Sequence, residues 1–138
     1  MPRTVVLRHD LSDGSHHYDW LIEPMGSAAS ADDDATAHPD RRELIAWRLP
    51  EPPHSSAALS MTADRLPPHR RRYLDYEGPV SGNRGSVVRI ARGEAEVLSD
   101  TPDRFEARGR IADRAFRLDA TPSPASGEAA WRLTVIWE

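Results

Sequence analysis

The C-terminal half of the chain alternates apolar and polar residues with a period of two. Phe116, Leu118 and Ala120 occupy every second position of one segment, and the pattern recurs from Trp131 to Trp137. Successive side chains of a β-strand point to opposite faces of a sheet, so this period predicts strands with one buried face. Strands are expected at residues 43–49, 86–91, 94–99, 104–110, 114–120 and 130–137, with turns at 92–93, 101–103 and 121–127.

The N-terminal segment has the pattern of a β-hairpin. Residues 5–7 (VVL) form a β-prone run, and Tyr18, Trp20 and Ile22 fit a returning strand. Asp13-Gly14 between them is a strong hairpin-turn signal. We therefore expect two paired antiparallel strands at the start of the chain.

The middle of the chain is harder to assign. Residues 57–62 (AALSMT) fit either a strand or a short helical turn, and Pro67-Pro68 is expected to interrupt the backbone. A single helical turn is then predicted from His69. On a helix His69 and Tyr73, four residues apart, would project from the same face.

About eight short strands with one or two helical turns predict an all-β fold, either a small antiparallel β-barrel or a sandwich. The length of 138 residues suits a single domain, 1–138. Within it, residues 26–40 are small and acidic and are expected to form a flexible inserted surface loop. The four tryptophans are expected to pack the core or the rim of the barrel.

The composition limits which kinds of metal site the chain can form. The chain has no cysteine, which excludes disulfides and thiolate zinc sites, so any metal would be held by histidine and carboxylate. No apolar run approaches the length of a membrane span and the start lacks a signal-peptide pattern, so a soluble, cytoplasmic protein without membrane contacts is expected.

All 18 basic residues are arginine, and the net charge is −4. Residues 65–92 nevertheless contain seven arginines against two acidic residues. A local basic face on an acidic protein suits an anionic ligand bound at one site. The alternative is a solvated charged surface.

Two histidines and an aspartate are expected to meet on one face of the hairpin. His17 and Asp19 share a face because they are two residues apart on a strand, and His9 lies near the position opposite His17. Two imidazoles and a carboxylate suit a divalent transition metal such as manganese or zinc. The alternative is a set of solvent-facing polar residues on an edge hairpin.

These residues also form part of a wider pattern. Arg8-His9 followed by residues 17–23 (HYDWLIE) resembles the RH…HYDLRLE signature of the phosphoesterase domain of bacterial DNA ligase D. Residues 46–50 (AWRLP) resemble that family's S-W-A-V-P strand. His69, Tyr73 and residues 76–78 (YEG) resemble its D-H-P-x-x-Y-x-x-F-E-G block, and Gly82 and Gly85 its glycine-rich turn. The resemblance covers nearly the whole chain outside residues 26–40.

The resemblance implies a small β-barrel with a central cleft. It implies a metal-dependent phosphoesterase, typically with Mn²⁺, that removes a terminal ribonucleoside and then the remaining 3′-phosphate from DNA or DNA/RNA primer-template ends during DNA repair. His9, His17 and Asp19 would hold the metal, and His69 and Tyr73 would contact the scissile phosphate. End-joining ligase machinery is the implied partner of a chain that we expect to be a monomer.

The signature has an arginine two residues after its aspartate, where this chain has Leu21. Pro68, Arg84 and Glu51 also stand at positions where the family has an acidic residue, a tyrosine and a basic residue. Arginines from other strands are candidates to bind phosphate in place of the missing side chain: Arg8, Arg48, Arg65 and Arg84.

Three functions remain open on this pattern. The first is the 3′-end-processing phosphoesterase. The second is a non-catalytic module that binds a metal or a nucleic-acid end without turnover, which Leu21 favours. The third is a hydrolase that uses the same metal site on small phosphate esters.

Overall fold

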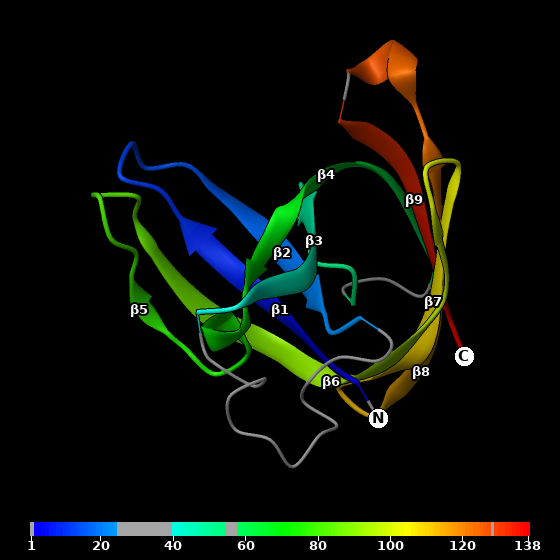
Figure 1. The fold of residues 1–138 in the computed structure, drawn as a ribbon, viewed down its shortest axis with the longest axis horizontal. Helices are drawn as coiled ribbons and strands as arrows, with labels where there is room; N and C mark the ends of the chain where they lie inside the picture. The colour runs from blue at the N-terminus through cyan, green and yellow to red at the C-terminus, as the bar shows by residue number, and fades with distance from the viewer. Residues whose placement is uncertain (1, 25–39, 55–57, 128) are drawn as a thin grey trace.

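The protein is described by a computed structural model that covers residues 2–24, 40–54, 58–127 and 129–138. This part of the chain folds into nine antiparallel strands in one sheet, in the order β1-β2-β3-β4-β9-β8-β7-β6-β5 (Figure 1). Pairing of β1 with β6 closes the sheet into a ring. The predicted all-β, barrel-like architecture is confirmed.

The strands and short helices have the following bounds. They are β1 Arg3–Asp10, β2 His16–Ile22, β3 Arg42–Leu49, β4 Ala58–Arg70, the 3₁₀ helix η2 Arg71–Leu74, β5 Gly78–Pro79, β6 Ser86–Thr101, β7 Arg104–Ile111, β8 Arg114–Pro122, the 3₁₀ helix η3 Pro124–Ser126 and β9 Ala130–Trp137. The expected loop at 26–40 lies outside the described residues except for Asp40. Neither helical turn among the described residues has the length or apolar character needed to span a membrane.

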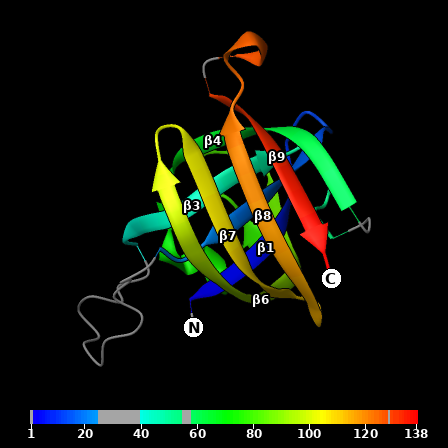
Figure 2. The ribbon, with the colours of Figure 1, turned by 90° about the vertical axis from the view of Figure 1, so that its right-hand side faces the viewer.

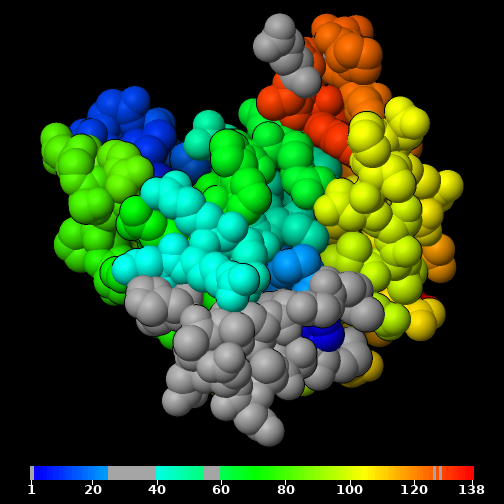
Figure 3. Space-filling view, in the orientation of Figure 1, coloured from blue at the N-terminus to red at the C-terminus, as the bar shows by residue number. Residues whose placement is uncertain are grey.

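Two long strands join the halves of the ring. The first part of β4 pairs with β9 and its last part with β3. In the same way β6 pairs first with β1 and then with β7. Figure 2 shows β7, β8 and β9 side by side in front of β1 and β3. In the surface view, the tip of the β1–β2 hairpin lies beside the segment that follows β5, on the side of the molecule away from β7 (Figure 3).

The expected turn at Arg92-Gly93 is wrong. The chain continues through this point as one strand, and Gly93 lies where β6 changes partner from β1 to β7. A Cβ atom on Gly93 would lie 1.8 Å from the carbonyl oxygen of Arg110 on β7. The glycine thus permits a close backbone approach within a strand, a use that sequence alone does not distinguish from a turn.

The expected break at Pro67-Pro68 is also wrong. β4 runs from Ala58 through both prolines, which settles the choice at 57–62 in favour of a strand for the described residues. The register between β3 and β4 shifts on both sides of Leu44, so the strand passes the prolines with irregular pairing. The helical turn therefore begins at Arg71 and not at His69, which lies in β4.

The main core fills the ring. It includes Trp20, Trp47, Phe105 and Phe116, all at most 1 % exposed, and Trp131 packs against it while partly buried. Trp137 is buried as well and donates a hydrogen bond from Nε1 to the carbonyl oxygen of Pro53 at 2.9 Å. The expected role of the four tryptophans in core and rim packing is confirmed.

A second apolar cluster lies on the opposite face of β1, β2 and β3. Its members on β1, β2 and β3 alternate with those of the main core. The buried members are Val5, Leu7, Leu21, Leu44, Ala46, Leu74 and Val87. Leu74 belongs to η2, so the segment after β4 covers this face. Both faces of the N-terminal sheet are therefore packed.

A buried ion pair fastens η2 to this sheet. The guanidinium of Arg71 contacts Glu23 Oε2, and it donates to Glu43 Oε1 at 3.0 Å. The side chains of Arg71 and Glu23 are 7 % and 2 % exposed. The other carboxylate oxygen of Glu23 accepts the backbone N–H of Arg3. Glu23, which directly follows β2, thus holds both β1 and η2 in place.

We predict that Gly93→Ala lowers the free energy of unfolding by about 2 kcal/mol, because the added methyl group overlaps the β7 backbone. Arg92→Ala, on an exposed neighbouring residue, should change it by less than about 0.5 kcal/mol. Urea denaturation measures both. Equal stability of the two variants would contradict a close approach of β6 and β7 at Gly93.

We also predict that Glu23→Gln costs about 3 kcal/mol, because it leaves the buried Arg71 with a single carboxylate partner. Asp75→Asn removes an exposed ion pair with Arg3 and should cost no more than about 1 kcal/mol. Thermal or urea unfolding compares the two. A smaller loss for Glu23→Gln than for Asp75→Asn would show that the buried pair does not anchor η2.

Candidate metal centre

The β1–β2 hairpin sets the register of the metal-binding candidates. Residues 11–15 connect the strands, with a hydrogen bond from Leu11 N–H to the Ser15 carbonyl at 2.8 Å. Gly14 adopts a φ of 90°, which favours glycine. This connection pairs His9 directly with His17. The position expected for His9 from the sequence is therefore confirmed.

His9, His17 and Asp19 converge on one face of the hairpin. One ligand atom from each lies within 4.8 Å of the others. Asp19 stands between the imidazoles, with Oδ2 3.7 Å from His9 Nδ1 and Oδ1 3.2 Å from His17 Nε2. The three side chains are 16 %, 13 % and 6 % exposed, so they form a recessed group and not a solvated edge.

Two atoms of this group lack hydrogen-bond partners among the described residues. His17 Nε2 and Asp19 Oδ1 are both buried, and their 3.2 Å contact lacks hydrogen-bond geometry. A buried acceptor without a partner is costly, and a cation bound between the two atoms would remove that cost. The donor set therefore fits a divalent metal ion.

His9 is oriented by the backbone. Its Nε2 donates a hydrogen bond to the carbonyl oxygen of Arg84 at 2.6 Å, which leaves Nδ1 facing Asp19. Metal-bound histidines are commonly held in this way, with the other ring nitrogen donating to a carbonyl or carboxylate. Arg84 lies in the turn before β6, so the glycine-rich turn at 81–85 supports the site from outside the hairpin.

The electrostatics favour a charged carboxylate. Burial alone would raise the pKa of Asp19, but its contacts with His17 and His9 and its interaction with nearby His69 lower that pKa to about 2. Contact with Asp19 raises the pKa of His9, against the effect of burial. Asp19 is therefore ionised at neutral pH and available to a cation.

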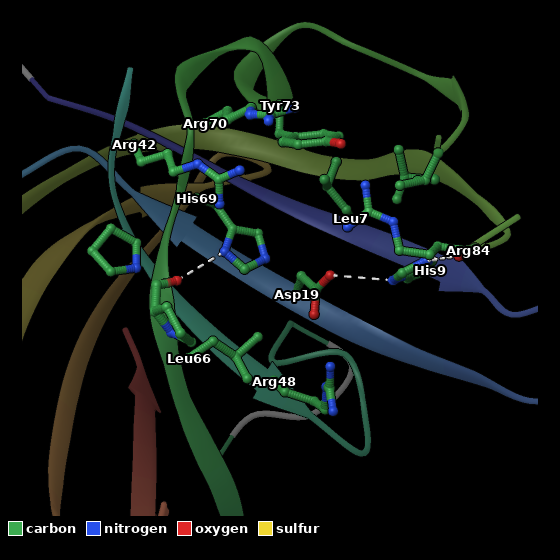
Figure 4. A pocket seen from close by; sticks show the side chains of 14 residues that line it. Leu7, His9, Asp19, Arg42, Arg48, Leu66, His69, Arg70, Tyr73 and Arg84 are labelled. Atoms are coloured by element: carbon green, nitrogen blue, oxygen red, sulfur yellow. Dashed lines mark hydrogen bonds and ion pairs between the residues drawn. The ribbon is translucent and has the colours of Figure 1, made fainter. Parts of the chain in front are cut away.

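A pocket of about 310 Å³ opens beside this group (Figure 4). Its apolar wall comes from Leu7, Leu66, Pro67, Pro68, Val80 and Val87. Its polar lining brings His9 and Asp19 together with residues from β3, β4, η2 and the 81–85 turn: Arg42, Arg48, His69, Arg70, Tyr73 and Arg84. His17 contacts Asp19 but is not part of the lining.

The structure brings His69 and Tyr73 into this pocket, as the sequence pattern implies. Their ring centroids lie 6.4 Å apart, although His69 is on a strand and Tyr73 on a 3₁₀ helix. His69 Nδ1 donates to the carbonyl oxygen of Pro67 at 3.0 Å, so its Nε2 is left for a ligand. Figure 4 shows the His69 ring near Asp19, on the opposite side of the carboxylate from His9.

The four candidate phosphate-binding arginines divide into two pairs. Arg48, opposite Asp19 in the register of β2 and β3, and Arg84 line the pocket. Arg8 alternates to the other face of β1 and pairs with Asp10 at 3.0 Å. Arg65 pairs with Asp100 and stacks 5.1 Å from the Trp47 ring. The structure does not place Arg8 or Arg65 in the pocket.

Sequence reasoning did not select Arg42 and Arg70, which line the pocket. Arg42 was detectable, since it shares the alternation of Leu44, Ala46 and Arg48 along β3. Arg70 was not, because the prolines before it obscure which way β4 points. Leu21 is fully buried in the second apolar cluster. Two residues after Asp19, where the signature has an arginine, this chain therefore has an apolar side chain.

The basic stretch at 65–92 is only partly a ligand-binding face. Arg70 and Arg84 line the pocket, whereas Arg71 and Arg72 pair with carboxylates. Arg89 donates to the Leu74 carbonyl at 3.3 Å and so supports η2.

No family model matches the chain, and no curated protein matches it either.

We predict that His17→Ala weakens Mn²⁺ binding at least about tenfold, because it removes one ligand from a three-residue set. His16→Ala is the matched control, since His16 lies on the other face of β2 beside Tyr18. Calorimetric titration of both variants with Mn²⁺ measures the effect. Equal affinities for the two variants would contradict a metal site at His9, His17 and Asp19.

Proposed function

We propose that this protein is a metal-dependent phosphoesterase that removes a 3′-phosphate or a 3′-ribonucleoside from the ends of nucleic acids. One observation carries the proposal. Two members of the metal-binding group, His9 and Asp19, line one pocket with His69, Tyr73 and the arginines at 42, 48, 70 and 84, and His17 contacts Asp19 from beside it.

The pocket suits a phosphate group bound next to a cation. Arginine binds phosphate oxygens with two parallel N–H donors, and the partly enclosed site strengthens such contacts relative to water. Arg48 is the register partner of Asp19 on β3, and the backbone carbonyl of Arg84 accepts the hydrogen bond from His9. The Arg84 guanidinium also donates to Ser81, at 2.6 Å and 3.0 Å. Arg48 and Arg84 would neutralise the non-bridging oxygens of a bound ester.

The cation would be a divalent transition metal. Two imidazoles and one carboxylate are compatible with manganese, zinc or a related ion, and the resemblance to the ligase D phosphoesterase domain favours Mn²⁺. Such an ion would draw negative charge from the phosphate and acidify a water molecule.

The protein side chains supply the remaining parts of hydrolysis. The water oxygen would form a bond to phosphorus and release a proton to solvent, and the bond from phosphorus to the leaving sugar oxygen would break. The leaving oxygen is the 3′ oxygen when a 3′-phosphate is removed, and the 5′ oxygen of the last nucleoside when a 3′-ribonucleoside is removed. Protonated His69, with Nδ1 held by Pro67, would give the Nε2 proton to that leaving oxygen. The Tyr73 hydroxyl would donate to a non-bridging oxygen and hold the group in line.

The assignment to nucleic-acid 3′ ends rests on the residue pattern. His9, residues 17–23 and the block from His69 to Gly78 occur in the order typical of the ligase D phosphoesterase domain. DNA or DNA/RNA primer-template ends are the substrates we propose, with end-joining ligase machinery as a partner.

A non-catalytic end-binding module is the second candidate, and the burial of Leu21 favours it. An apolar residue at this position removes a bidentate donor that would stabilise charge in the transition state, an effect worth about 3–4 kcal/mol for comparable donors. Binding would survive that loss better than turnover. This candidate predicts tight binding of a 3′-phosphorylated end with no hydrolysis.

We predict that the purified protein with Mn²⁺ releases phosphate from a primer-template with a recessed 3′-phosphate. Asp19→Asn should abolish release, because it removes a charged ligand. His69→Gln should lower kcat by about 100-fold or more, through loss of the proton donor. Single-turnover assays with a labelled primer measure these rates.

His16→Ala serves as the control for surface changes on the same hairpin and should retain the full rate. Phosphate release at equal rates from the native protein and Asp19→Asn would overturn the proposal. Tight binding of the primer without release would select the end-binding module.

A further inference from the structure

The pocket contains a second pair of arginines that the proposed reaction does not use. We propose that Arg42 and Arg70 form a separate phosphate subsite, which binds the internucleotide phosphate next to the 3′ end. This inference rests on the proposed function, because it names the part of the substrate that follows the terminal phosphate.

Arg42 and Arg70 face each other across two antiparallel strands. They are direct register partners on β3 and β4, and both line the pocket. Like charges placed opposite each other on neighbouring strands repel and destabilise the sheet. An anion bound between them would replace that repulsion with two charge-assisted contacts.

The neighbouring arginines are neutralised, whereas this pair is not. Arg41 contacts Glu43 at 3.6 Å, Arg71 contacts Glu23 and Glu43, and Arg72 contacts Asp40. The side chains of Arg42 and Arg70 make no hydrogen bond or ion pair with any residue that the structure describes. The chain thus supplies carboxylates to the arginines on either side and leaves the pocket-facing pair available to a ligand.

The pair lies at one end of the pocket. In Figure 4, Arg42 and Arg70 stand beside His69 and Tyr73, while His9 and Arg84 lie at the opposite end and Asp19 lies between. A phosphate at the metal-binding group would contact Arg48 and Arg84 on its own side. Arg42 and Arg70 would then be placed for a second anionic group of the same ligand.

A nucleic-acid strand supplies such a group. Its phosphates are evenly spaced along one chain, so a terminal 3′-phosphate at Asp19 is always followed by a phosphodiester. Arginine is suited to both positions, since its planar guanidinium binds mono- and diester oxygens alike. The inferred substrate is therefore an oligonucleotide with at least one internal phosphodiester, and not a simple phosphate monoester.

Two dinucleotides test this subsite directly. Each is a dithymidine with a 3′-phosphate, and they differ only in an internal linkage that is either a charged phosphodiester or a neutral methylphosphonate. Fluorescence competition without added metal measures their affinities for the full-length protein. We expect the phosphodiester ligand to bind about tenfold tighter, as two charge-assisted contacts would allow.

Arg42→Ala and Arg70→Ala should each reduce this preference by several-fold and leave the affinity for the methylphosphonate ligand unchanged. Arg72→Ala, which lies outside the pocket, should keep the full preference. Equal affinity of the native protein for the two ligands would overturn the subsite. Equal weakening of both ligands by Arg42→Ala would also overturn it, because the pair would then belong to the terminal phosphate site.

Hydrolysis separates this inference from the proposed function. With Mn²⁺, the protein should release phosphate from both dinucleotides, with a lower KM for the phosphodiester. Release from both with identical KM would keep the phosphoesterase and remove the subsite. A preserved binding preference with no release from either ligand would keep the subsite and remove the phosphoesterase.

Discussion

The structure depends on a sheet that is packed on both faces. Along β1, β2 and β3, one set of alternating side chains fills the ring and the other set forms the second apolar cluster. The second face requires a cover, which η2 and the residues after it provide. The buried contact between Arg71 and Glu23 holds that cover in place. The candidate site lies at the edge of this second face, where the apolar cluster gives way to His9 and Asp19.

This arrangement explains how the site combines burial with charge. Asp19 lies next to Leu21 on the same face of β2, so apolar neighbours exclude water from one side of the carboxylate. His9, His17 and His69 compensate for that burial, which keeps the pKa of Asp19 low. A carboxylate that is both buried and ionised is suited to hold a cation. The arginines that line the pocket add positive charge beside this group.

Alternation made most of the fold predictable from the sequence. The hairpin, the strands from Arg104 onward and the shared face of His17 and Asp19 all follow from a period of two. The turn expected at Gly93 and the chain break expected at Pro67-Pro68 were wrong, because glycine and proline occur in turns and also at irregular positions inside strands. Their role depends on which strand lies alongside, and that is a property of the tertiary fold.

The residues of the candidate site were also predictable in part. His9, His17 and Asp19 follow from hairpin register, and His69 and Tyr73 from the resemblance of the motif. Apart from Arg42, which shares the alternation of β3, the arginines were not assignable, since a charged side chain on a strand points to solvent, to a carboxylate or into a pocket. Arg8 and Arg65 satisfy carboxylates elsewhere, whereas Arg42 and Arg70 line the pocket. These outcomes depend on which carboxylates lie beside each arginine in the folded sheet.

We propose that this hairpin holds a divalent metal inside a phosphate-binding pocket. Anomalous diffraction from a crystal soaked in Mn²⁺, recorded at the manganese absorption edge, tests it most directly. We expect one strong peak within coordination distance of His9 Nδ1, His17 Nε2 and the Asp19 carboxylate. A manganese peak elsewhere, with no peak beside these three residues, would contradict the proposed metal site.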